Sequence, residues 1–142
     1  MLVRCLYASR AATPFDETML DGILTQSRKN NPLRGITGML CFANDIFVQV
    51  LEGGRADVAA LFGAIIRDAR NTDVQMLSYE EISERRFGNW TMGQVNLANI
   101  NPALLLKFSE RAELNPFTCT AAATMALLQE IAATGCIISR SS

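Results

Sequence analysis

Five short apolar stretches alternate with two amphipathic segments along the first 96 residues of the chain. Each stretch has the length and composition of a β-strand. The second and third are separated only by Ala43-Asn44-Asp45, which predicts a hairpin turn. The predicted strands span residues 2–9, 36–42, 46–52, 73–81 and 89–96.

The two intervening segments carry apolar residues at spacings of three and four, which is typical of amphipathic helices. The first helix is predicted to begin after Asp16, a favourable N-cap residue, and to end near Asn30, because the residue before Pro32 disfavours the α region. Its apolar face becomes polar near its end, at Ser27 and Asn30. The second helix is predicted to end near Arg70 and has the most regular pattern, with Val58, Leu61, Phe62, Ile65 and Ile66 on one face.

The resulting order β-α-β-β-α-β-β predicts an α+β, ferredoxin-like fold, a mixed five-stranded sheet with both helices on one face. We therefore expect one domain over residues 1–96. Residues 97–142 form a C-terminal helical extension with two apolar segments, separated at Leu114-Asn115-Pro116, and Gly135 is a predicted C-terminal cap. This extension would cover the other face of the sheet as a cap, or form an oligomer or partner interface.

Composition excludes several classes of function. The 142-residue chain has a net charge of −1 and scattered basic residues, which argues against nucleic-acid binding. It has no histidine, which excludes Ser-His and Cys-His hydrolases, and its four cysteines form no C-x-x-C pair, so we expect no metal site. No apolar run is long enough for a membrane span, and the N-terminus reads as a strand, so we expect a cytoplasmic protein with reduced thiols.

Gln49 lies in the middle of a predicted buried strand, between Phe47 and Leu51 on one face. A buried amide without a partner costs about 1–3 kcal/mol, so Gln49 should have one. Tyr7 is a candidate, because the first and third strands are central neighbours in this topology. With Ser27, Asn30 and Asn31 nearby, these residues describe a small-molecule pocket. A core glutamine and a core tyrosine with ordinary hydrogen bonds are the alternative interpretation.

Five motifs in this order and spacing resemble the BLUF family of flavin-binding blue-light receptors. The resemblance covers residues 1–96, whereas residues 97–142 resemble the variable helical cap of short family members more loosely. The motifs are Leu6-Tyr7-Ala8-Ser9, Asn30-Asn31-Pro32 with Gly35-Ile36-Thr37-Gly38, Phe47-Val48-Gln49-Val50-Leu51-Glu52-Gly53, Asp68-Ala69-Arg70, and Arg86-Phe87-Gly88-Asn89-Trp90-Thr91-Met92.

The resemblance implies a non-covalent FAD whose isoalloxazine ring lies between the two helices. FMN and riboflavin also fit this expectation, since the family pocket mainly grips the ring. Asn31 would hydrogen-bond the polar edge of the ring, and the Arg70 guanidinium would make a bidentate contact with the phosphate of the tail. Asn71 stands where family members often have histidine. The implied cofactor-binding residues are Ile23, Ser27, Asn30, Asn31, Phe47, Gln49, Ile65, Asp68 and Arg70.

In the family, the tyrosine matching Tyr7 donates to the excited flavin, and the glutamine matching Gln49 bridges the two. An amide suits this role because rotation or tautomerisation exchanges its donor and acceptor ends. Trp90 and Met92 are predicted to share one face of the fifth strand, where only one of them approaches Gln49 at a time. Their exchange would be a two-state element, and simple packing at the sheet edge is the alternative.

We therefore expect a photoreceptor without catalytic output that signals to a downstream protein in trans, and we expect it to form a homo-oligomer. Two rivals are a small enzyme on the same fold, either acylphosphatase-like or flavin-dependent, and a protein-binding module that never binds flavin. The segment after the first strand lacks a glycine-rich phosphate cradle, and the chain has no G-x-G-x-x-G motif.

Overall fold

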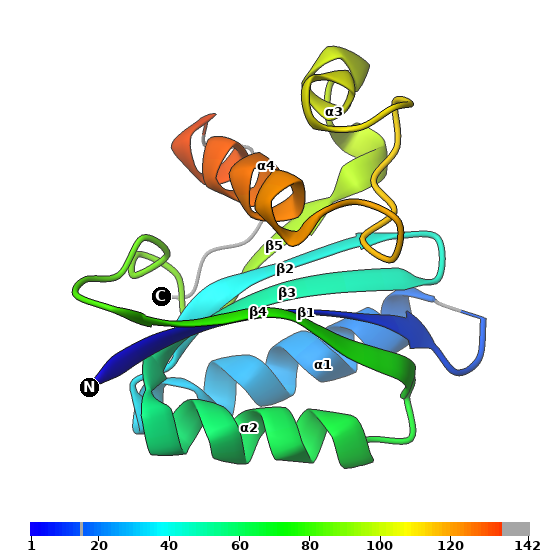
Figure 1. Cartoon of the computed structure of the whole chain (residues 1–142). Helices are drawn as coiled ribbons and strands as arrows, with labels where there is room; N and C mark the ends of the chain where they lie inside the picture. The colour runs from blue at the N-terminus through cyan, green and yellow to red at the C-terminus, as the bar shows by residue number, and fades with distance from the viewer. Residues whose placement is uncertain (15, 135–142) are drawn as a thin grey trace.

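A computed structural model describes residues 1–14 and 16–134 of the chain and shows one five-stranded sheet between two layers of helices (Figure 1). The strand order is β4-β1-β3-β2-β5. All neighbouring pairs are antiparallel except β2 and β5, which makes the sheet mixed. The predicted ferredoxin-like arrangement with an added strand is therefore confirmed. The strands are β1 (Leu2–Ala11), β2 (Thr37–Ala43), β3 (Ile46–Gly54), β4 (Asn71–Ile82) and β5 (Gly93–Asn96).

Helices α1 (Glu17–Asn30) and α2 (Arg55–Arg67) lie side by side on one face of the sheet (Figure 1). The Asp16 side chain accepts a hydrogen bond of 2.8 Å from the Met19 backbone N–H, so it caps α1 as predicted. After α1 the chain makes the short 3-10 helix η1 (Pro32–Arg34) and turns at Gly35, whose φ of 64° favours glycine.

The opposite face of the sheet is covered by the C-terminal extension, in which α3 (Pro102–Phe108) and α4 (Ala121–Thr134) follow the 3-10 helix η2 (Leu97–Asn99) (Figure 1). Leu127, Leu128 and Ile131 of α4 are fully buried against the sheet. We call α3, α4 and the loop between them the cap. The described part of the extension therefore covers the open face.

Alternation along β3 separates the two cores. Phe47 and Leu51 pack under α1 and α2, whereas Val48 and Val50 pack under the cap. Tyr7 joins the first group, as its position in β1 predicts. The sheet thus has a helix face and a cap face, each with its own hydrophobic core.

Three predicted details differ from the structure or fall outside it. The strand predicted at 89–96 begins only at Gly93, because residues 87–92 form turns and bends. Helix α2 ends at Arg67 rather than near Arg70. The predicted cap residue Gly135 lies outside the described residues.

Candidate functional site

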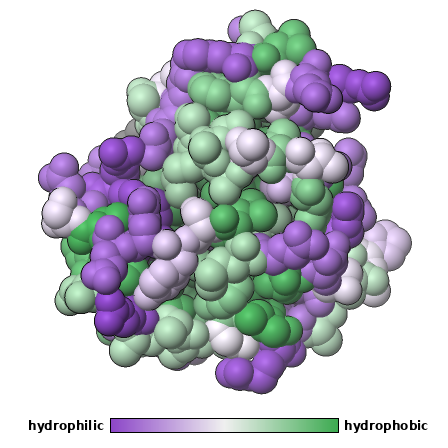
Figure 2. Space-filling view, viewed as in Figure 1, coloured by the Kyte–Doolittle hydropathy of each residue, from purple (hydrophilic) through white to green (hydrophobic). Residues whose placement is uncertain are grey.

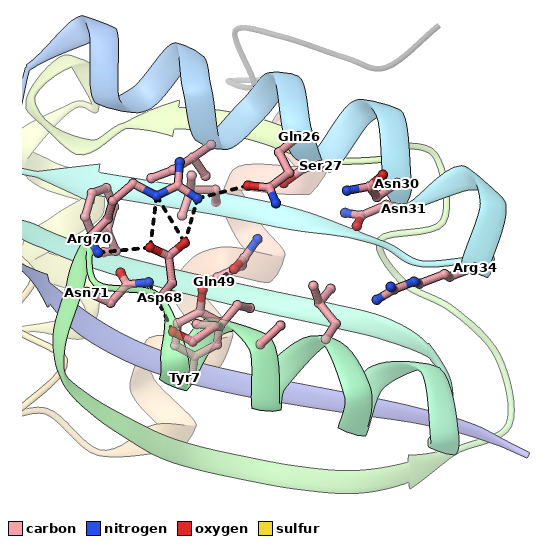
Figure 3. A pocket seen from close by; sticks show the side chains of 16 residues that line it. Tyr7, Gln26, Ser27, Asn30, Asn31, Arg34, Gln49, Asp68, Arg70 and Asn71 are labelled. Carbon is pink, nitrogen blue, oxygen red and sulfur yellow. Dashed lines mark hydrogen bonds and ion pairs between the residues drawn. The ribbon is translucent and has the colours of Figure 1, made fainter.

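A cleft opens between α1 and α2 above the helix face of the sheet (Figure 3). The empty space among its lining atoms, counted out into open solvent, is about 830 Å³. It is lined by Tyr7, Ile23, Gln26, Ser27, Asn30, Asn31, Arg34, Leu40, Phe47, Gln49, Leu61, Ala64, Ile65, Asp68, Arg70 and Asn71. All nine predicted cofactor-binding residues are therefore in one cleft.

A chain of hydrogen bonds forms the floor of this cleft. Tyr7 in β1 and Gln49 in β3 are directly paired across the antiparallel ladder. The Tyr7 hydroxyl donates to Gln49 Oε1, and Gln49 Nε2 donates to Met92 Sδ at 3.1 Å. Tyr7 and Gln49 are only 4% and 5% exposed. The predicted partner of the buried amide is therefore Tyr7, and the second partner is a sulfur.

The environment keeps the Tyr7 phenol protonated. Burial raises its pKa far above the usual range, and the nearby Cys5 and Asp68 raise it further. The Tyr7 ring is held by edge-to-face packing on Phe62 of α2, with ring centroids 5.5 Å apart. Tyr7 is thus a fixed, neutral hydrogen-bond donor that points at one amide oxygen.

Polar side chains from the end of α1 line the cleft away from Tyr7. Ser27, Asn30 and Asn31 reach it from successive turns (Figure 3). Asn31 is 2% exposed, and its Nδ2 donates to the Thr91 carbonyl at 3.4 Å. The polar end of the α1 face, visible in the sequence, therefore becomes one wall of the cleft.

Apolar side chains form the remaining walls. Ile23 of α1 and Ile65 of α2 line the cleft from the two helices, and Phe47 lines it from the sheet. A flat apolar ring with polar edges suits such walls. The predicted site residues do not include Leu40, Leu61 and Ala64, although Leu61 belongs to the predicted apolar stripe of α2.

Arg70 is engaged within the protein. Its Nε and Nη2 atoms contact the Asp68 carboxylate, with an Nη2–Oδ2 distance of 2.6 Å, and Nη2 also donates to Gln26 Oε1 at 2.9 Å (Figure 3). This pair lowers the pKa of Asp68, chiefly through the hydrogen bond from Arg70. The bidentate fork predicted for a phosphate therefore holds a carboxylate and bridges α1 to the 68–70 turn.

Besides Gln26, which contacts Arg70, two polar residues of the cleft are not among the predicted site residues. Asn71 accepts a bond from the Ser9 hydroxyl at 3.1 Å and so links β1 to the start of β4. Arg34 reaches the cleft from η1 (Figure 3). Neither is signalled by periodicity, since both follow the end of a helix.

Trp90 and Met92 do not share a face, which corrects the sequence prediction. Both precede β5, where the chain turns and crosses the edge of the sheet. Met92 packs in the core of the helix face and contacts Gln49, whereas Trp90 packs in the core of the cap face. The buried Trp90 Nε1 has no hydrogen-bond partner among the described residues. Trp90 and Met92, two positions apart in the sequence, therefore link the core of the cap face to the core of the helix face.

The cleft fits a flavin by its own chemistry. It combines apolar walls, amides at one end and a buried amide whose two ends are engaged by an O–H donor and a soft acceptor.

Within residues 1–14 and 16–134, no group of three potential metal ligands comes together. In the same part of the chain, no helix is long and apolar enough to cross a membrane.

Comparison with known proteins agrees with this geometry. The sequence profile of the BLUF family, described as sensors of blue light using FAD, matches residues 2–93. A photoactivated adenylate cyclase subunit beta-like protein of Euglena gracilis is 34% identical over 92 residues, which are 64% of this chain and 11% of that protein. The chain thus spans about a tenth of the curated relatives it matches.

Two solved structures extend the similarity beyond the sheet. BlsA in its photo-activated state has a TM-score of 0.82 and 31% identity, and the alignment covers 100% of this chain and 99% of BlsA. BlrB, a BLUF protein in its dark state, has a TM-score of 0.80 and 30% identity, with 94% and 96% of the two chains covered. The chain belongs to the BLUF family of flavin-binding blue-light sensor domains.

Proposed function

We propose that this chain is a light-driven switch that binds FAD non-covalently in the cleft and signals to a separate protein. The observation that carries the proposal is the buried Tyr7–Gln49–Met92 chain on the cleft floor. The family supplies the ligand class, since its members are described as using FAD.

The residues that would hold the ring are those of the cleft walls. Ile23 and Ile65 would lie on the two sides of the ring, and Phe47 would lie beneath it. Ser27, Asn30 and Asn31 would hydrogen-bond its polar edge. Asp68 and Arg70, whose ion pair orders the 68–70 turn, would lie near the tail. Because most of these contacts address the ring, FMN and riboflavin should also bind.

The bound flavin would supply absorption of blue light and, when excited, an acceptor for an electron and a proton from Tyr7. Gln49 would then change which end of its amide faces Tyr7. Its Oε1 accepts from Tyr7 in this structure and its Nε2 donates to Met92. Reversal of the amide would place its N–H group toward the Tyr7 oxygen and its oxygen toward Met92 Sδ. The bond with Tyr7 would then change direction, and the bond with Met92 would be lost, because a thioether sulfur only accepts.

The output would leave through the segment that crosses the sheet edge. On the helix face Met92 accepts a hydrogen bond from Gln49, and on the cap face Trp90 packs against the cap. A shift of this segment would change the packing of the cap, and through it the binding of a partner in trans or of a second copy. In this proposal the chain performs no catalysis and acts through a separate effector. The free thiols of Cys5, Cys41 and Cys119 support a reducing, cytoplasmic location.

The test is a light-minus-dark difference spectrum on the purified protein and on Tyr7→Phe and Gln49→Leu. The wild type should be yellow and show a reversible red shift under blue light. Both variants should bind flavin and lose that shift. A colourless protein that cannot be reconstituted with FAD, FMN or riboflavin would exclude the proposal and favour an enzyme or a flavin-free binding module on this fold.

A further inference from the structure

A buried carboxylate, Glu52, contacts the segment that carries Trp90 and Met92. Glu52 lies at the end of β3 on the cap face and is fully buried. Its Oε1 accepts from the Phe87 backbone N–H at 2.7 Å, and both carboxylate oxygens lie 3.1 Å from the Arg86 backbone nitrogen. One side chain therefore fixes two consecutive peptide N–H groups of a loop.

Arg4 of the neighbouring strand β1 forms an ion pair with the Glu52 carboxylate. Arg4 is 4% exposed and pairs with Glu52 across the β1–β3 ladder, with its Nε 2.8 Å from Glu52 Oε2. Its Nη1 contacts Glu80 of β4 at 2.8 Å, and the Glu80 side chain is 55% exposed. Glu80 therefore pairs with the same guanidinium from the solvent-exposed side.

Arg85 adds a second attachment beside the first. Its Nη1 donates to Thr37 Oγ1 at 2.9 Å and to the Glu52 backbone carbonyl at 3.3 Å. Both β2 and β3 are thus tied to the start of the loop. Further along, the Gly38 N–H donates to the Trp90 carbonyl at 3.0 Å, and Gln49 contacts Met92. The segment from Arg85 to Met92 is held at its start by buried charge and at its end by weaker, neutral contacts.

The geometry points to Glu52 as a positioning residue of the light switch: by fixing the Arg86 and Phe87 backbone it holds Met92 against Gln49 and sets the rate at which the lit state relaxes. Glu52 and Gln49 lie three residues apart on the same strand, so a displacement of β3 at Gln49 passes directly to the loop that carries Met92. Glu52 does not touch the cleft. The inference rests on the proposed function, because it concerns the relaxation of the same hydrogen-bond network.

A positioning role differs measurably from a merely structural one. Carboxylate bonds to peptide N–H groups are stronger than neutral ones, so their loss frees the loop more than the loss of any other contact along it. If relaxation requires the loop to rearrange around Met92, a freer loop lowers that barrier. A residue that only stabilises the fold would change the melting temperature and leave the relaxation rate unchanged.

The test compares Glu52→Gln with the matched control Glu80→Gln in the flavin-loaded full chain. The amide keeps the shape of Glu52 but presents an N–H group to Arg4 or to the loop. We expect Glu52→Gln to remain yellow and to return from the lit state about threefold faster or more, measured as decay of the red shift in the dark. Glu80→Gln, which alters the same arginine from the exposed side, should decay at the wild-type rate.

Arg85→Met provides a second variant in case Glu52→Gln fails to fold. It keeps the hydrocarbon stem of a partly exposed side chain and removes only the attachment to Thr37 and to the Glu52 carbonyl. We expect faster decay here too, by a smaller factor. The inference is wrong if both variants melt at lower temperature yet decay at the wild-type rate, or if Glu80→Gln accelerates decay as much as Glu52→Gln. A wild type without any red shift would instead refute the proposed function.

Discussion

The bond between Tyr7 and Gln49 should appear as a coupling free energy in a double-mutant cycle of unfolding. Tyr7→Phe removes the hydroxyl that donates to Gln49 Oε1, and Gln49→Leu removes that acceptor. Each single variant leaves one buried polar atom without its partner, whereas the double variant leaves neither. The two sites pair directly in the β1–β3 ladder, so one contact is tested.

The magnitude follows from burial. Tyr7 is 4% and Gln49 is 5% exposed, so water has little access to replace a lost partner. An unsatisfied buried donor or acceptor costs about 1–3 kcal/mol, while replacing both partners by apolar groups is close to neutral. Each single variant should therefore lose about 1–3 kcal/mol of unfolding free energy. The double variant should lose less than the sum by at least about 1 kcal/mol.

The assay is urea unfolding of the flavin-free proteins, because a change in flavin affinity would otherwise add to the measured stability. Thermal melting provides a second readout, at roughly 3 °C per kcal/mol for a chain of this size. Losses that simply add in the double variant would show that Tyr7 and Gln49 do not depend on each other, and would remove the basis of the proposed switch.

Three further outcomes follow from single positions. Gly38→Ala should lower the melting temperature clearly, because the added Cβ would lie 2.0 Å from the Val50 carbonyl oxygen of the paired strand; an unchanged melting curve would contradict this close approach. Burial raises the pKa of Cys5 from 9.0 to about 11, so its neutral form stabilises the folded state fully below pH 9 and this contribution is lost as the pH rises to 11. The loss amounts to about 2–3 kcal/mol. Between pH 9 and pH 11 the unfolding free energy from urea titrations should therefore fall by about that much more in wild type than in Cys5→Ala. Arg10→Gln removes a cation–π contact in which the guanidinium carbon lies 4.3 Å from the Phe117 ring centroid. The loss should cost about 0.5–1 kcal/mol and appear as faster amide exchange in the α3–α4 loop. Equal exchange in both proteins would mean that other contacts hold the loop.

Hydrophobic periodicity was sufficient to predict most of the fold. The alternation around Gln49 and the stripe of α2 each report directly on which side of the sheet a residue lies. The proximity of Tyr7 and Gln49 follows from topology, because the first and third strands are adjacent, whereas the structure supplies the register that pairs them directly. In an antiparallel ladder the paired numbers move in opposite directions, so the same register also pairs Arg4 with Glu52. Given that register, the buried ion pair could have been inferred from the sequence.

The positions of Trp90 and Met92 could not be obtained in this way. Their separation by two residues predicts a common face only if the chain is a strand, and here it is a turn that crosses the sheet edge. Turns of this kind are fixed by long-range contacts, here from Glu52 and Gly38, which leave no local period. The ion pair between Arg70 and Asp68 likewise leaves no local period in the sequence.

The pocket and the cap lie on opposite faces of one sheet, so substitutions that affect flavin binding and substitutions that affect the cap fall on different sets of residues. Substitutions under α3 and α4 can accumulate to suit a new effector without entering the flavin cleft, provided that the segment crossing the sheet edge keeps its anchors. On the proposed output route through the cap, the helix face could be retained as a sensor while the cap surface is exchanged. For protein engineering, this makes the cap face the natural place to graft a foreign effector, with residues 85–92 as the junction to preserve.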